Sequence, residues 1–155
     1  MRLLVIDDNA QMRSIIGTVL TAAGVGRLHY AQHGLQGLEI MRTSPIDLVY
    51  VDLEMPVMNG LAFVSAVRAL EGPERFMPLI MLTGHAERAK LDEARDRGVT
   101  EFLCKPVTAR TILTRLNSVI MTPRPFVMSG PYFGPDRRRR SCDDYGGPRR
   151  RSSDG

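Results

Sequence analysis

Short apolar runs in this sequence each end on a polar side chain that could take part in chemistry. These side chains are Asp7 and Asp8, Asp52, Thr83, and Lys105. Clustered carboxylate oxygens are the ligands that suit Mg²⁺, and a carboxylate beside a cation is a candidate nucleophile toward a phosphoryl group. The lysine ammonium would neutralise the oxygens of the transferred group, while the threonine hydroxyl would donate a hydrogen bond to it.

The elements that must position these side chains alternate between strand and helix five times within residues 1–121. Expected strands cover 3–6, 27–31, 46–51, 78–82 and 101–104, and a stretch of helically spaced apolar residues follows each. This alternation predicts an α/β fold, a doubly wound five-stranded parallel sheet with helices on both faces. The helix expected over 86–97 has eight charged side chains and only a thin apolar stripe, which predicts weak anchoring.

The carboxyl ends of parallel strands lie at one edge of a sheet, so the strand order decides which side chains meet there. In the common order 2-1-3-4-5 the first and third strands are neighbours, about 4.8 Å apart. Asp7, Asp8 and Asp52 then lie together, with Thr83 beside them. Lys105 starts two strands away and reaches back with its long side chain. Paired carboxylates at about 4 Å repel by on the order of 4 kcal/mol, which favours a bound cation such as Mg²⁺.

The charge of the chain is concentrated at its C-terminal end. Residues 1–121 hold thirteen basic and thirteen acidic side chains, whereas residues 122–155 hold eight arginines, four aspartates, five prolines and five glycines. We therefore expect one domain over 1–121 and a disordered tail over 122–155. The arginine runs 137–140 and 149–151 are interpreted as solvated charge, with a nucleic-acid or acidic-partner contact as one alternative. A second alternative is docking of the tail onto its own domain through Phe126, Tyr132 and Phe133.

The two cysteines, Cys104 and Cys142, lack CxxC spacing, which argues against a zinc site or a disulfide framework and fits a reducing compartment. Cys104 is expected to be an unpaired core residue. The N-terminal apolar run turns acidic after four residues, and no stretch approaches the length of a membrane span. A cytoplasmic protein without membrane contact is therefore expected.

Residues 1–121 resemble the receiver domain of two-component response regulators. The motifs that carry the resemblance are Asp7-Asp8, Asp52 with Met55-Pro56 and Gly60, Thr83-Gly84, and Lys105-Pro106. With no ordinary DNA-binding domain after it, the chain resembles the single-domain regulators, extended by a basic tail.

The resemblance implies that Asp52 accepts phosphate from a histidine kinase or a phosphotransfer protein. It implies Mg²⁺ held by Asp8, Asp52 and the backbone carbonyl of Glu54, with Asp7 acting through water. A cis Lys105-Pro106 bond is implied, as is a switch in which Thr83 moves toward phosphate while Phe102 turns inward. Glu54 and His85 are implied to tune the lifetime of the phosphoryl group. An output partner, unidentified, would read the change at the face formed by residues 86–121.

Two other classes of function compete with this switch. A phosphatase of the haloacid-dehalogenase type also uses a strand-end aspartate, but it needs a second aspartate two residues later, where this chain has Glu54. A receiver-like scaffold whose arginine-rich tail does the binding is the other alternative. A flavodoxin-like cofactor site is disfavoured because the first strand ends on two carboxylates, which would repel a phosphate.

Overall fold

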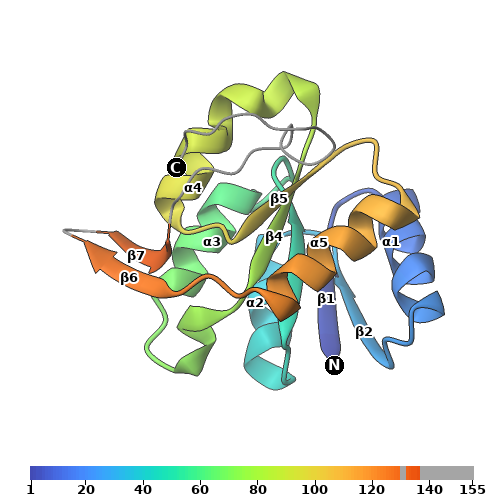
Figure 1. The fold of residues 1–155 in the computed structure, drawn as a ribbon, viewed down its shortest axis with the longest axis horizontal. Coiled ribbons are helices and arrows are strands. Elements are labelled where there is room, and N and C mark those ends of the chain that lie inside the picture. The colour runs from blue at the N-terminus through green and yellow to red at the C-terminus, as the bar shows by residue number, and fades with distance from the viewer. Residues whose placement is uncertain (130–131, 137–155) are drawn as a thin grey trace.

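The computed structural model describes residues 1–129 and 132–136, apart from the side chains of residues 85, 86 and 129. Its central layer is a parallel sheet of five strands in the order β2-β1-β3-β4-β5, as predicted (Figure 1). The strands are β1 (Arg2–Ile6), β2 (Arg27–Ala31), β3 (Leu48–Asp52), β4 (Leu79–Thr83) and β5 (Glu101–Cys104). Their observed limits agree with the expected ones to within two residues.

Helices cover both faces of the sheet. They are α1 (Ala10–Ala22), α2 (Gly34–Thr43), α3 (Gly60–Arg68), α4 (Leu91–Arg97) and α5 (Ala109–Met121), with the 3-10 helices η1 (Pro73–Phe76) and η2 (His85–Lys90). Apolar side chains of α1 and α5 pack on one face of the sheet, and those of α2, α3 and α4 pack on the other. All five residues of β3 are buried, as expected for a strand covered on both sides.

The charged segment expected as one helix over 86–97 is instead divided into η2 and α4. Only Leu91 and Ala94 of the seven α4 residues are buried, so the short α4 helix has few apolar anchors. Gly98, with φ of 109°, ends the helix.

The tail expected to be disordered from residue 122 contains regular structure at residues 126–129 and 132–135. Strands β6 (Phe126–Ser129) and β7 (Tyr132–Pro135) pair antiparallel as a hairpin, which lies beside α3 and α4 (Figure 1). Sequence periodicity missed the hairpin because its strands have four residues each and are held by contacts with the domain. The arginine runs 137–140 and 149–151 lie outside the described residues.

In the described part of the chain, no helix has both the length and the apolar character that crossing a membrane requires.

Candidate functional site

Three carboxylates meet at the carboxyl ends of β1 and β3, as the strand order predicts. Asp7, Asp8 and Asp52 each place a carboxylate oxygen within 4.8 Å of the others. Asp7 and Asp52 are buried, and Asp8 is exposed. The cluster is therefore open to solvent on one side and enclosed by protein on the other.

Local hydrogen bonds fix the position of Asp7. Its Oδ1 accepts from the backbone N–H of Asn9 at 2.9 Å, and the Asn9 side chain in turn caps α1 by accepting from Met12 N. Arg13 donates to the backbone oxygen of Asp7 at 2.6 Å. The other carboxylate oxygen, Oδ2, has no hydrogen-bond partner within the described residues. A buried oxygen of this kind is available to a cation or to water.

Asp52 ends β3, and the start of α3 is packed closely behind it. A Cβ atom on Gly60 would lie 2.4 Å from the backbone oxygen of Asp52, so only glycine allows this approach. Asn59 caps the helix by accepting from Ala62 N at 2.9 Å. The Gly60 of the motif is thus explained by the space that Asp52 requires.

Lys105 crosses from the end of β5 to Asp52. The Lys105 backbone N–H donates to the Thr83 carbonyl at 2.7 Å, and its Nζ lies 2.8 Å from Asp52 Oδ1. Thr83 is buried at the end of β4, the strand that lies between β3 and β5. The Lys105–Pro106 peptide bond is cis, as predicted. The structure therefore brings together Asp7, Asp8, Asp52, Thr83 and Lys105.

The electrostatics of the site favour the binding of positive charge. Burial, reinforced by the Asp7 carboxylate and opposed by Lys105, raises the pKa of Asp52 to about 6. Burial also raises the pKa of Asp7. For Lys105, burial alone would lower the pKa, but the hydrogen bond and charge of Asp52 outweigh it and raise the pKa. One ammonium thus offsets three carboxylates incompletely.

The remaining predicted site residues lie around this cluster. Glu54 is half-exposed, and its carboxylate forms a 2.6 Å ion pair with Lys90 of η2. Phe102 is already buried in β5, beneath the Arg95 guanidinium. The inward rotation of this ring that the resemblance implies would therefore begin from a side chain that is already buried. The side chain of His85 lies outside those the structure describes. Cys104 is disulfide-bonded, and its partner lies outside the described residues. This corrects the expectation of an unpaired thiol and removes the cysteine argument for a reducing compartment.

Sequence reasoning missed Glu87, which adds a fourth carboxylate near the site. Its Oε1 accepts from the backbone N–H of Gly84 at 2.8 Å, directly after Thr83. Its negative charge raises the pKa of both Asp52 and Lys105. The spacing of Gly84 and Glu87 is that of a helix start with an acidic third residue, and this signal could have identified the contact.

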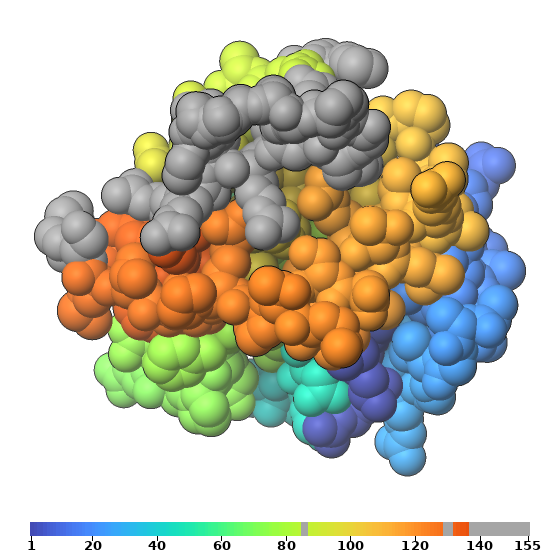
Figure 2. Space-filling model, in the orientation of Figure 1, coloured from blue at the N-terminus to red at the C-terminus, as the bar shows by residue number. Residues whose placement is uncertain are grey.

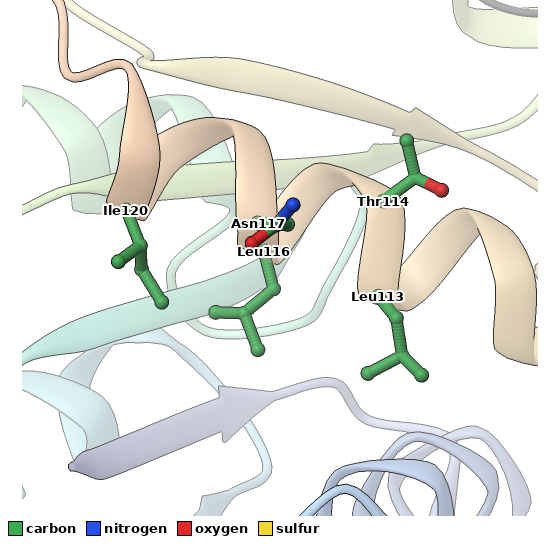
Figure 3. A pocket seen from close by; sticks show the side chains of 5 residues that line it. All are labelled: Leu113, Thr114, Leu116, Asn117 and Ile120. Carbon is green, nitrogen blue, oxygen red and sulfur yellow. The ribbon is translucent and has the colours of Figure 1, made fainter.

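A separate hollow of about 450 Å³ lies along α5, lined by Leu113, Thr114, Leu116, Asn117 and Ile120. Leu113, Leu116 and Ile120 point to the same side of the helix (Figure 3). None of these residues belongs to the acidic cluster, so the hollow is an apolar surface feature distinct from the site.

Comparisons with known proteins give one consistent result. The sequence profile for the response regulator receiver domain matches residues 3–117. A chemotaxis protein CheY homolog of Campylobacter jejuni is 35% identical over 123 residues, which are 79% of this chain and 94% of the relative. Chemotaxis protein CheY-3 of Vibrio cholerae is 32% identical over 119 residues, 77% and 91% of the two chains.

The solved structure of the chemotaxis response regulator CheY4 of Vibrio cholerae is also similar. It has a TM-score of 0.70 at 32% identity, covering 76% of this chain and 97% of that one. The family match ends at residue 117, before the hairpin formed by β6 and β7.

Proposed function

This chain belongs to the response regulator receiver family, and we propose that Asp52 is its phosphoacceptor in a two-component phosphorelay. The donor is a histidine kinase or a histidine phosphotransfer protein. One observation carries the proposal: a buried strand-end carboxylate lies 2.8 Å from Lys105 Nζ and shares a cluster with Asp7 and Asp8. A cytoplasmic location is part of the same proposal, and it rests on the receiver family rather than on the cysteines.

The donor set fits Mg²⁺. Three carboxylates converge, and Asp7 Oδ2 has no hydrogen-bond partner among the described residues, which suits a hard cation that retains water ligands. We assign Asp8, Asp52 and the backbone carbonyl of Glu54 as its direct protein ligands, with Asp7 acting through water. When bound, the ion neutralises charge on the transferring phosphoryl oxygens.

In the proposed reaction an oxygen of Asp52 attacks the phosphorus of a phosphohistidine. The new oxygen–phosphorus bond forms as the phosphorus–nitrogen bond breaks, and the donor imidazole leaves with the bonding electrons. The Lys105 ammonium, already beside Asp52, pairs with the phosphoryl oxygens. The Thr83 hydroxyl donates a hydrogen bond to one of them. Glu54 and His85 control the access of water to the product.

The change is transmitted through residues 86–121, where an output partner reads it. The short α4 helix has two buried residues, so a small change in charge at the site can move it. Phe102 is buried before any modification, so we assign the larger movement to η2 and α4. The chain acts as a phosphoacceptor, not as an enzyme with turnover.

The test is incubation of the full chain with Mg²⁺ and acetyl phosphate, followed by intact mass measurement. The proposal predicts an alkali-labile phosphoryl adduct that the Asp52→Asn variant does not form. A phosphatase would release phosphate without accumulating an adduct, and a scaffold would do neither. Either of these results would contradict the proposal.

A further inference from the structure

The hairpin, defined as residues 124–129 and 132–136 and containing β6 and β7, lies beyond the part of the chain that the family match covers. It packs onto the segment between α3 and β4, drawn in green in Figure 2. Phe126 and Phe133 of the hairpin contact Phe76 of η1, with ring centroids 5.1 and 5.5 Å apart. Edge-to-face and tilted ring pairs at these distances stabilise an interface beyond the apolar area that they bury.

Two arginines of the domain complete this aromatic contact. The Arg75 guanidinium lies 3.9 Å from the centre of the Phe133 ring, and that of Arg68 lies 4.9 Å from the Phe126 ring. Arg68 is buried and donates to the carbonyls of Gly98 and Met77 at 3.0 and 2.7 Å. Burial lowers the pKa of Arg68 to about 10. The Phe126 ring therefore covers a buried cation that binds the C-terminal end of α4.

The hairpin also contacts α4 directly. A Cβ atom on Gly134 of β7 would lie 3.0 Å from the Cα atom of Gly98, the residue that ends α4. The two backbones therefore approach as closely as glycines allow. A shift of this end of α4 would alter its contact with the hairpin.

A third contact is made to the first residue of β5. Glu101 is buried, and its carboxylate lies 3.3 Å from Arg124 Nε and 3.6 Å from Arg115 Nη1. Arg124 also donates to the carbonyl of Asp136 at 2.7 Å, which closes the base of the hairpin. Removing one of the two guanidiniums would leave the buried Glu101 carboxylate incompletely paired, which destabilises the fold.

The hairpin thus touches the far ends of two elements whose near ends form the phosphoacceptor site. The segment containing η2 and α4 begins after Gly84, beside the site, and ends at Gly98, which contacts the hairpin. Strand β5 begins at Glu101, which contacts Arg124 of the hairpin, and is followed by Lys105 at the site. Charge added to Asp52 acts on Lys105 and on Glu87, one on each element.

We propose that the hairpin is a built-in regulatory clamp that holds α4 and β5 in the arrangement adopted when Asp52 is unmodified. The inference rests on the proposed function. Because the docked hairpin fits this arrangement, it opposes phosphorylation, and by linkage a phosphoryl group on Asp52 loosens the hairpin to the same degree. The hairpin thereby opposes phosphorylation of Asp52 and also responds to it.

Hydrogen exchange on the unaltered full chain tests this, with Mg²⁺ and beryllium fluoride as the phosphoryl probe. We expect exchange at residues 83–91 to change, and amides of residues 124–136 to exchange faster by about fivefold or more. Asp52→Asn should abolish both effects. Changes at 83–91 without any at 124–136 would overturn the inference and leave the proposed function standing. No change at either segment would overturn both.

A pair of variants tests the reciprocal effect. Phe126→Ala combined with Phe133→Ala should raise the affinity for beryllium fluoride by about fivefold, because the clamp no longer opposes its binding. The matched control is Val127→Ala with Met128→Ala, which alters two exposed residues of the same hairpin and should leave affinity unchanged. Equal or weaker affinity in the phenylalanine variant than in this control would overturn the clamp.

Discussion

Nζ of Lys105 lies 2.8 Å from Oδ1 of Asp52, although β4 separates the strands that carry the two residues. The side chain of Lys105 spans this gap because its backbone is held to Thr83 at the end of β4. The single ammonium offsets the charge of Asp7, Asp8 and Asp52 only in part. Most of the behaviour expected of the site follows from this imbalance.

Replacing Asp52 by asparagine should stabilise the folded chain at pH 8 without Mg²⁺. Burial raises the pKa of Asp52 from 3.8 to about 6, so the folded state favours the protonated form. Below about pH 3 both states are protonated and the variant should match the parent. As pH rises from about 4 to about 6 the parent loses on the order of 3 kcal/mol, which the variant retains, and above pH 6 the difference stays constant. Urea unfolding at about pH 3 and pH 8 measures this, and equal stability at pH 8 would contradict it.

Asp47 is the control, because its pKa is shifted in the opposite direction to that of Asp52. Hydrogen bonds from Arg2 lower the pKa of Asp47, and the pair lies at the other end of the sheet, where β1 begins. Asp47→Asn should therefore destabilise the chain slightly at neutral pH, and this difference should disappear as pH falls below the ordinary carboxylate pKa. A stabilisation like that of Asp52→Asn would show that the effect is not specific to the site.

Mg²⁺ should raise the melting temperature in a way that depends on pH and on the acidic cluster. Binding needs ionised carboxylates, so affinity should rise with pH through about 6, where Asp52 ionises. Asp8→Asn should weaken binding about tenfold or more, whereas Asp47→Asn should not. Thermal shifts at a series of Mg²⁺ concentrations at pH 5 and pH 8 test this. A shift of equal size at both values would argue against these ligands.

Glu87→Gln should speed phosphorylation by acetyl phosphate. Glutamine keeps an oxygen to accept from Gly84 N–H but removes the charge that raises the pKa of Asp52. The gain should be roughly threefold and larger at pH 6 than at pH 8, because more Asp52 becomes ionised. Glu71→Gln, at an exposed position after α3, is the control. A rate equal to that of this control would show that Glu87 does not act on the site.

Gly60→Ala should destabilise the fold and slow phosphorylation together. Alanine favours a helix by about 1 kcal/mol over glycine, but its Cβ would lie 2.4 Å from the Asp52 backbone oxygen. The strain of about 1–3 kcal/mol should displace the end of β3. Gly26→Ala, with no atom within 4 Å of the added Cβ, should do neither. Urea unfolding and the phosphorylation rate measure the two effects, and an unchanged rate would contradict this account of Gly60.

The sequence predicted the parts of the site that depend on strand order. Once β1 and β3 are neighbours, the carboxylates at their ends must meet, and Asp47 must lie at the opposite end. Glu87 was missed because the helix was expected to begin at residue 86, whereas η2 begins at His85 and makes Gly84, three residues before Glu87, its N-cap.

The hairpin was not predictable from local pattern. Its strands are too short to show a period, and Phe126 is held by Phe76 and Arg68, which lie about fifty residues earlier in the chain. Composition placed the start of a different segment at residue 122. Docking of the tail onto its own domain was one of the alternatives for this segment, and the contacts of Phe126 and Phe133 with Phe76 confirm it. The sequence could not show which domain residues, Phe76 with Arg68 and Arg75, would receive those rings.

The most direct test of the central claim is to locate the phosphoryl group on the chain. After incubation with Mg²⁺ and acetyl phosphate, borohydride reduction converts an aspartyl phosphate to homoserine, which peptide mass analysis identifies. The account predicts conversion at Asp52 alone. Conversion at Asp7 or Asp8, or no conversion while the chain remains folded, would contradict it.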